Sequence, residues 1–290
     1  FRDKLAMRMR AQTMGLRVPE FVHLLNDEQI RSFTQRVPAP WVIKPRSSAG
    51  AIGIKKAHNE GELWSVIESL GDERAAYLLE RYVPGEVFHV DSLVHDGKIV
   101  FQRASRYGKP PLDVSHGGDV FTTRLMPAET SDARALIEMN SQVLAAMRLA
   151  RGSSHTEFIR GRDDGQVYFL ETSARVGGAH IADMVEAATG LNPWREWAKI
   201  ELAGENGSYE LPQIRDEYAG LIVSLARQES PDTSAFDDPE VVWRMDKKQH
   251  IGLIVRSPSP SRIDDLLAKY VERIRTDFHA VVPPQERPTD

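Results

Sequence analysis

Two glutamates stand on neighbouring strand-like runs of this chain, and an arginine follows the second of them. The first run, residues 155–159, holds Glu157, and the second, residues 169–178, holds Glu171 and Arg175. Positions 157 and 171 are an even number apart, so both side chains can face one side of an antiparallel strand pair. Paired carboxylates repel each other unless a cation lies between them, and magnesium that also binds phosphate oxygens is such a cation. The pattern therefore predicts a divalent metal site for a nucleotide triphosphate.

Two more side chains extend this predicted metal site. Ser173 offers a neutral hydroxyl oxygen two residues beyond Glu171. Arg175 can pair with a phosphoryl group or with a negatively charged intermediate. The competing interpretation is that Glu157 and Glu171 are ordinary strand residues on a solvated face. The spacing of the two glutamates along the chain is compatible with a metal site and with a solvated strand face.

A lysine at the end of a strand leads into a loop of small residues. Lys44 ends the predicted strand 41–44, and the following loop, residues 47–53, contains Ser48 and Gly50. An ammonium group and backbone N–H groups in this arrangement can bind phosphate oxygens. No Gly-Lys-Ser/Thr closes the loop, so it is not a Walker A loop. The alternative is a surface loop with an exposed lysine.

A second strand, residues 76–80, runs into a turn that can bind an adenine ring. Backbone groups at this junction offer donors and acceptors to the adenine edge, and Tyr82 and Val83 line its face. Glu86 can accept hydrogen bonds from ribose hydroxyls. The alternative is that Glu80 and Glu86 are surface charges on either side of a turn.

Capping residues and apolar spacing predict the elements that hold these motifs. Asp3 caps a first helix whose apolar face holds Leu5 and Met9. An Asp96-Gly97 turn joins two alternating runs, which is a strong hairpin signal. Further helices are predicted to begin at or after Asn26, Asn59, Ser131 and Ser261, short strands at residues 221–226, 241–245 and 251–255, a long polar loop at 107–118, and a solvated tail at 283–290.

Composition narrows the class of protein. The 290 residues are 41% hydrophobic and 27% charged, as in an ordinary soluble globular protein. No apolar run reaches the roughly 20 residues of a membrane span, and the net charge of -5 argues against a nucleic-acid partner. The chain has no cysteine, which excludes disulfides, thiolate metal sites and a cysteine nucleophile, and which fits a cytoplasmic enzyme. Histidines that stand singly are expected to be structural hydrogen-bonding residues and not zinc ligands.

Taken in order from Arg2 to about Gly204, these motifs resemble the ATP-grasp superfamily. The resemblance implies that Lys4 and Lys44 contact nucleotide phosphates. The acids that match Glu157 and Glu171 hold magnesium in the family, where an asparagine usually stands at the position of Ser173. The nucleotide-binding residues that it implies are Lys4, Lys44, Ser48, Gly50, Glu80, Arg81, Tyr82, Val83, Glu86 and His89.

Within that superfamily, the sequence motifs His-Thr-Glu-Phe and Glu-Thr-Ser-Ala-Arg-Val-Gly-Gly resemble those of carboxylate–amine ligases, particularly L-amino-acid ligases. The resemblance implies an enzyme that uses ATP and magnesium, with manganese as the alternative ion. It converts a carboxylate to an acylphosphate, releases ADP and phosphate, and joins an amine. Lys44 and Arg175 would be the catalytic residues. The loop 107–118, with Arg106, Lys109 and His116, would help to form the acceptor pocket.

The resemblance also implies a domain organisation. We expect an α+β ATP-grasp fold with a small mobile lid on a larger antiparallel-sheet body. Residues 1–35 would be a helical segment leading into the fold, 36–81 the lid, 82–205 the catalytic subdomain and 206–290 a C-terminal α+β addition. The N-terminal α/β domain of the family would then precede Phe1 and be missing here.

Two other functions compete with a carboxylate–amine ligase. One is a biotin-carboxylase-like or carbamoyl-phosphate-type step that activates bicarbonate. The other is a non-catalytic nucleotide-binding module, which predicts the loss of metal ligands or phosphate lysines, although all of these are present here. We expect a small-molecule carboxylate and amine as partners, no nucleic acid and no membrane, with a second copy of the chain in a homodimer as a further candidate partner.

Overall fold

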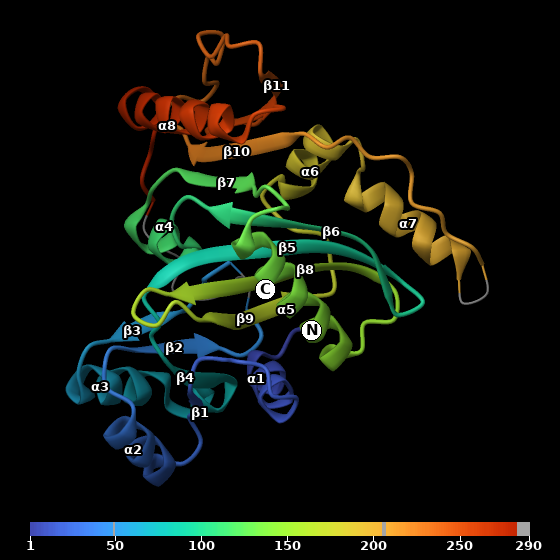
Figure 1. Ribbon diagram of the computed structural model, residues 1–290. Helices are drawn as coiled ribbons and strands as arrows, with labels where there is room; N and C mark the ends of the chain where they lie inside the picture. Colours follow the sequence, from blue (N-terminus) through green and yellow to red (C-terminus); the bar gives the residue numbers. More distant parts are fainter. Residues whose placement is uncertain (49, 205–206, 283–290) are drawn as a thin grey trace.

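Two antiparallel sheets make up the strand framework of the protein. The computed structural model describes residues 1–48, 50–204 and 207–282. The predicted tail at 283–290 and Ala49 of the predicted phosphate loop lie outside the described residues. Figure 1 shows the smaller sheet and its helices at one end of the molecule and the C-terminal helix α8 (Pro260–Asp277) at the other. The predicted α+β class with antiparallel sheets is confirmed.

The smaller sheet has the strand order β1-β4-β2-β3. Its elements are β1 (Phe21–His23), β2 (Trp41–Pro45), β3 (Lys55–Ala57) and β4 (Tyr77–Arg81), with helices α2 (Asp27–Arg36) and α3 (Glu60–Leu70) and the 3-10 helix η1 (Gly71–Ala76). Ile43 and Leu79 pack against α2 and α3 in one apolar core. Because side chains alternate along a strand, Lys44 and Glu80 point to the opposite face.

The larger sheet has the strand order β11-β12-β10-β7-β6-β5-β8-β9, and every neighbouring pair is antiparallel. Its strands are β5 (Gly85–His95), β6 (Lys98–Tyr107), β7 (Phe121–Leu125), β8 (Gly152–Gly161), β9 (Val167–Ser173), β10 (Tyr218–Leu225), β11 (Val241–Arg244) and β12 (His250–Ser257). The three predicted C-terminal strands are therefore present, and β10 joins them to the sheet by pairing with β7.

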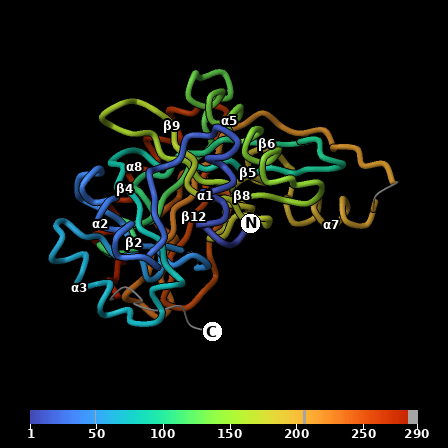
Figure 2. The backbone as a smooth tube through the Cα atoms, turned by 90° about the horizontal axis from the view of Figure 1, so that it is seen from below, coloured from blue at the N-terminus to red at the C-terminus, as the bar shows by residue number. Residues whose placement is uncertain are grey.

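Helices cover the larger sheet. They are α1 (Lys4–Thr13), α4 (Pro111–Gly117), α5 (Ser131–Met147), α6 (Ile181–Thr189), α7 (Pro193–Ala203) and α8. Phe88, Phe158 and Phe169 pack with α1 and α5 on one face of β5, β8 and β9. Helix α8 packs on β10 and β12 through Leu266 and Tyr270. Figure 2 shows α7 projecting from the body on the side opposite α2 and α3.

Local sequence signals account for most element boundaries. Asp3, Asn26 and Asn59 are helix N-caps, and each side chain accepts hydrogen bonds from backbone N–H groups of the first turn. Asp96 and Gly97 both have positive φ angles, 50° and 71°, which suits the tight turn between β5 and β6. The predicted caps and hairpin are confirmed.

Two sequence predictions are wrong. Helix α1 buries Lys4, Met7, Arg8 and Ala11, whereas Met9 is 57% exposed. Apolar spacing chose the wrong face because two cations of α1 are buried through ion pairs with acids far along the chain. The predicted loop 107–118 contains the short helix α4, whose first position is Pro111, a residue suited to a helix start.

The small sheet takes in more of the chain than residues 36–81. Strand β1 pairs with β4, and α2 packs in the same core as α3. The division into subdomains stays a prediction. Among the described residues, no helix combines the length and apolar character needed to span a membrane.

Candidate active site

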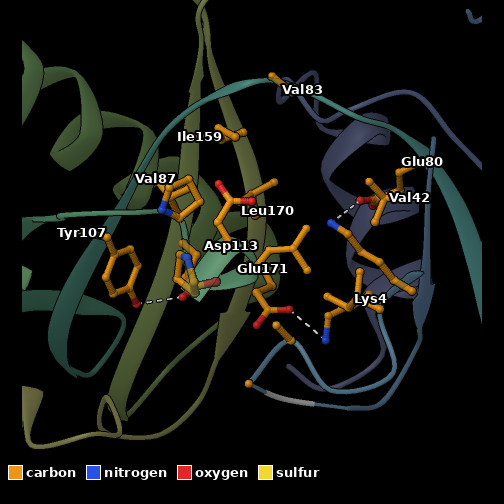
Figure 3. Close-up of a pocket in the computed structure, with 18 of the residues that line it drawn as sticks. Lys4, Val42, Glu80, Val83, Val87, Tyr107, Asp113, Ile159, Leu170 and Glu171 are labelled. Carbon is orange, nitrogen blue, oxygen red and sulfur yellow. Dashed lines mark hydrogen bonds and ion pairs between the residues drawn. The ribbon is translucent and has the colours of Figure 1, made fainter. Parts of the chain in front are cut away.

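A cavity of about 360 Å³ lies between the small sheet and the large one. Figure 3 shows its walls, to which β2 and β4 contribute from one side and β5, β8 and β9 from the other. Most residues predicted for the site line this cavity: Lys4, Lys44, Ser48, Gly50, Glu80, Arg81, Tyr82, Val83, Glu157, Glu171 and Arg175. Ser173 lines an adjoining cavity of about 550 Å³, which shares Lys4, Ser48, Glu171 and Arg175 with the first.

Two predicted nucleotide-binding residues do not line the cavity. Gly85 and Val87 do, so Glu86 between them points to the other face of β5, where it is exposed and pairs with Arg106. His89 points to the cavity side but is fully buried. The rings of Tyr107 and His155 cover it, with ring centres 4.7 and 5.0 Å from its own.

The two glutamates of the predicted metal site face each other directly. Glu157 of β8 and Glu171 of β9 are register partners in an antiparallel pair, so their side chains share one face. A β-bulge follows immediately, because Phe158 pairs with Phe169 and Leu170 is left as the extra residue. Phe169 consequently packs in the core with α5 while Glu171, two residues later, faces the cavity.

Glu157 is held by two groups of the larger sheet. The Tyr107 hydroxyl donates to Glu157 Oε1 at 2.8 Å, and His155 Nε2 lies 3.7 Å from the same oxygen. Burial alone would favour a neutral Glu157, but His155 and Tyr107 hold the pKa of this carboxyl below its ordinary value. Burial, together with the nearby Glu157, raises the pKa of Tyr107 well above its ordinary value, so the hydroxyl stays a donor.

The buried side chain of His155 lies between two acids, Asp91 and Glu157. His155 Nδ1 lies 2.8 Å from Asp91 Oδ1, and Asp91 Oδ2 lies 2.7 Å from His89 Nδ1. Burial opposes a charge on His155, but Asp91 and Glu157 outweigh it and raise the pKa of His155 to about 10. Burial would likewise raise the pKa of Asp91, yet the two histidines hold it well below its ordinary value.

Glu171 is paired with the first predicted phosphate lysine. Lys4 Nζ lies 2.8 Å from Glu171 Oε2 and donates to the Ser48 carbonyl at 2.5 Å. These contacts join α1, β9 and the loop after β2, as Figure 3 shows for Lys4 and Glu171. An ammonium group therefore already neutralises one acid of the pair.

The second lysine predicted to bind phosphate pairs with a buried acid. Lys44 Nζ lies 2.6 Å from Glu80 Oε2, and Arg8 Nε lies 2.5 Å from Glu80 Oε1. Burial would raise the pKa of Glu80, but Arg8 and Lys44 outweigh it and lower this pKa to about 2. Arg8 also donates to the carbonyl of the bulge residue Leu170. Glu80 therefore orients Lys44 with its carboxylate, a role that spacing alone did not reveal.

Arg175 lies at the junction of the two cavities. It is exposed and lines both of them, and its guanidinium donates to the Val176 carbonyl at 2.8 Å. Glu171 and Lys4 line the same two cavities, and a guanidinium group can bind an anion through several NH groups at once.

These residues fit a magnesium-bound nucleotide. Two carboxylates on directly opposed strand positions supply hard oxygen ligands, and the ion pair of Lys4 with Glu171 shows that a cation suits this point. Ser173 stands beyond the second acid with a hydroxyl that faces the adjoining cavity. Apolar walls for a planar base come from Val42, Val83, Val87, Ile159 and Leu170.

The predicted acceptor loop reaches the cavity with different residues. Pro110, Pro111, Leu112 and Asp113 line it. Arg106 pairs with Glu86 instead, and Lys109 pairs with Asp119. The roles of Arg8 and of the Tyr107–Glu157 contact are not visible in the sequence, because no spacing rule links residues whose partners lie 72 and 50 positions away.

Comparison with known proteins relates the chain to ligases. A family described as an ATP-grasp domain matches residues 37–183. The L-arginine-specific L-amino acid ligase of Bacillus subtilis is 26% identical over 208 residues, which is 69% of this chain and 49% of that protein. The D-alanine–D-alanine ligase of Neisseria gonorrhoeae (strain NCCP11945) is 25% identical over 196 residues, or 65% of this chain and 63% of that protein. The chain thus spans about half of the length of the first relative and less than two thirds of the length of the second.

Solved structures share the fold at lower identity. The L-amino acid ligase from Bacillus licheniformis superimposes with a TM-score of 0.73 at 17% identity, over 97% of this chain and 73% of that one. Carboxyaminoimidazole ribonucleotide synthase from Aspergillus clavatus gives the same TM-score at 13% identity, over 94% of this chain and 74% of that one. At these identities the likeness concerns the fold alone.

Proposed function

Because this chain belongs to the ATP-grasp family, we propose that it is part of an ATP- and magnesium-dependent carboxylate–amine ligase. The observation that carries the proposal is the placement of Glu157 directly across from Glu171, in a cavity that Lys4, Lys44 and Arg175 also line. Magnesium would be held by Glu157 and Glu171, with Ser173 as a further oxygen donor; manganese is the alternative ion. When bound there, the metal would neutralise phosphate charge.

The first step activates a carboxylate. A carboxylate oxygen of the substrate attacks the terminal phosphorus of ATP, the bond to the bridging oxygen breaks, and ADP leaves. Lys4 and Lys44 contribute by neutralising negative charge on the phosphate oxygens. Glu80 keeps Lys44 directed into the cavity, since its carboxylate lies 2.6 Å from the ammonium group. The product is an acylphosphate with a good leaving group.

The second step forms the C–N bond. The amine attacks the acyl carbon, the bond from carbon to the phosphate oxygen breaks, orthophosphate leaves, and the amine nitrogen loses a proton. Arg175 orients the substrate carboxylate and stabilises the oxyanion that forms at the acyl carbon. Exclusion of water by the small sheet protects the acylphosphate from hydrolysis.

Amino acids are the substrate class that we propose. The relatives named above are ligases of L-amino acids and of D-alanine, and this chain matches only part of each. The fold is also shared with carboxyaminoimidazole ribonucleotide synthase, so the choice of carboxylate has to be tested directly.

The test is a substrate screen with product identification. The full-length protein is incubated with ATP, magnesium and pools of amino acids and other carboxylates, with and without bicarbonate, and the nucleotide and phosphate products are measured. We expect ADP and orthophosphate to appear only when amino acids are present.

Three results would contradict the proposal. AMP and pyrophosphate would exclude the acylphosphate route. Dependence of ADP release on bicarbonate instead of amino acids would indicate carboxylation chemistry. Tight ATP binding without any turnover would indicate a nucleotide-binding module.

A further inference from the structure

We propose that the buried hydrogen-bonded pair of Asp91 and His155, closed over by Gly177, positions Glu157 for the metal. This inference rests on the proposed function, because it assumes that Glu157 is a metal ligand. Asp91 does not line the cavity, whereas His155 does, almost fully buried, with its Nε2 atom 3.7 Å from Glu157 Oε1. Both act through Glu157 and are positioning residues.

The pair belongs to a chain of contacts that runs from the sheet interior to the cavity. Thr123 Oγ1 donates to the Arg106 carbonyl at 3.3 Å and lies 2.8 Å from His89 Nε2. His89 Nδ1 lies 2.7 Å from one oxygen of Asp91, and His155 Nδ1 lies 2.8 Å from the other. On the far side of the ring, His155 Nε2 lies 3.4 Å from the Tyr107 hydroxyl, its hydrogen-bond partner, and 3.7 Å from Glu157 Oε1, an ion-pair distance.

The chemistry of these groups sets both ring orientations. An ionised carboxylate only accepts hydrogen bonds, so Nδ1 of His89 and Nδ1 of His155 must both donate to Asp91. Asp91 therefore holds two imidazole rings at once, and the His155 ring presents its Nε2 edge to Glu157. Tyr107 completes the support by donating to Glu157 Oε1 at 2.8 Å. The other oxygen of Glu157 is left for the cavity.

The backbone at Gly177 packs directly against this hydrogen-bonded pair. A Cβ atom at position 177 would lie 2.8 Å from Asp91 Oδ1 and 3.0 Å from His155 Nδ1, which are the two atoms of the hydrogen bond. Only glycine therefore lets the segment after Arg175 close over the pair. Position 178 differs, because a Cβ there would meet only the Arg175 Nη1 atom at 3.9 Å. The first glycine of the double-glycine motif thus has a steric role that the second lacks.

Two simpler explanations account for these residues less well. A core role alone would be served by apolar side chains, since burying His89, Asp91 and His155 costs desolvation free energy. His89, Asp91 and His155 lie close enough together to be considered as ligands of a metal ion. A metal bound by them would need the ring nitrogens as lone-pair donors, which excludes their donating hydrogen bonds to Asp91. The Nδ1–carboxylate distances of 2.7 and 2.8 Å are those of hydrogen bonds.

The test measures metal affinity and not turnover. Binding of Mn²⁺ to the full-length protein is followed by electron paramagnetic resonance, with a non-hydrolysable ATP analogue present. We expect Asp91→Asn and Gly177→Ala each to raise the Kd for Mn²⁺ by about 10- to 100-fold, the usual effect of disturbing the groups that support a metal ligand from behind. The affinity for the nucleotide analogue without metal is expected to match that of wild type, because neither Asp91 nor Gly177 lines the cavity.

Matched variants separate this role from general damage. Gly178→Ala adds the same methyl group one residue later. Thr156→Val removes a buried hydrogen bond to Thr172 between β8 and β9, the strands that carry Glu157 and Glu171. Both are expected to keep the wild-type Kd for Mn²⁺. If Asp91→Asn does not fold, Gly177→Ala still decides the question, because its backbone has no positive φ angle to strain the added side chain.

The outcomes distinguish this inference from the proposed function. Wild-type Mn²⁺ affinity in Glu157→Gln would overturn the metal assignment itself. Lost affinity in Glu157→Gln with wild-type affinity in Gly177→Ala and Asp91→Asn would overturn only the positioning role. A transition metal that co-purifies with the protein and is lost in Asp91→Asn would also overturn it, since the three side chains would then be ligands.

Discussion

Acidic residues of the same type serve different purposes at this site, and their surroundings decide which. Glu80 is fully buried between Arg8 and Lys44, so its charge is neutralised by protein cations. Glu171 pairs with Lys4 and lines the cavity, so under the proposed function it would exchange that partner for a metal. Glu86 lies on the outer face and pairs with Arg106. Residue type alone did not separate these three roles.

Glu171→Gln is expected to abolish turnover while the fold stays intact. The amide keeps the size of the side chain but removes the charge that faces Glu157. We expect kcat to fall by more than about a hundredfold, because loss of even the groups behind a metal ligand costs about 10- to 100-fold in affinity or activity. Steady-state kinetics and circular dichroism would measure activity and fold.

Glu86→Gln is the matched control for that variant. It makes the same chemical change on the face of β5 that points away from the cavity. We expect its KM for ATP to stay within about twofold of wild type, as for ordinary surface substitutions. Full activity in Glu171→Gln would remove the metal assignment, and a large rise in the KM for ATP in Glu86→Gln would contradict the placement of that residue.

Short elements with little burial of their own form part of the cavity wall. Helix α4 has no buried residue among Pro111–Gly117, yet Pro111, Leu112 and Asp113 line the cavity. Its position therefore depends on contacts at its ends. Asp119 pairs with both Lys109, before α4, and Arg275 of α8, and His279 Nε2 lies 3.0 Å from the Gly118 carbonyl. The C-terminal part of the chain thus anchors one wall of the site.

Asp119→Asn is expected to loosen this wall. Without the carboxylate charge, the ion pairs to Lys109 and Arg275 are lost, and α4 buries none of its own residues. We expect amide hydrogen exchange in residues 108–118 to become several-fold faster, since local opening follows the loss of such contacts. Asp264→Asn, which removes the pair of α8 with Arg124, should leave exchange in that segment unchanged. Equal acceleration in both variants would contradict the anchoring role of Asp119.

At the scale of the whole molecule, helix α1 joins the two sheets. Arg8 reaches Glu80 of the small sheet and the Leu170 carbonyl of the large one. Lys4 likewise contacts Ser48 on one side and Glu171 on the other. Asp3 pairs with Arg46 in the loop after β2. Several charged contacts of helix α1 and its N-cap residue therefore join the two sheets, and the acid among them that lies in the small sheet titrates.

Acid should weaken this junction in a defined pH range. The pKa of Glu80 is lowered from 4.5 to about 2 in the folded protein, so its contribution to stability is complete above about pH 4.5 and is lost as the pH falls toward 2. A shift of this size corresponds to about 3 kcal/mol. Urea unfolding at pH 7, 4.5 and 3 would measure the loss.

Glu80→Gln tests whether that carboxyl is responsible. The variant leaves Arg8 buried without a charged partner, so we expect it to lose about 3 kcal/mol at pH 7. Its stability should then fall less than that of wild type between pH 4.5 and 3. Glu20→Gln changes an exposed acid whose nearest contact to Arg81 is 3.9 Å, and it should behave like wild type. Parallel pH curves for wild type and Glu80→Gln would assign the acid sensitivity to other groups.

Sequence by itself determined the local elements and the order of the chemical groups. Asp3, Asn26 and Asn59 cap helices, and Asp96-Gly97 turns a hairpin, because these effects involve neighbours within a few residues. The types and order of the lysines, glutamates and arginine were enough to indicate the family and the fold class. These features depend on residue types and on interactions between residues that are close in the sequence.

Only the tertiary structure decided which face each group occupies and what surrounds it. The bulge at Leu170 lets Phe169 enter the core while Glu171 enters the cavity, which alternation along a regular strand would not allow. The contacts of Arg8 with Glu80 and of Asp91 with His155 span 72 and 64 residues. Burial and charge neutralisation depend on such distant partners, because the free energy of a buried charge is set by what the fold brings beside it.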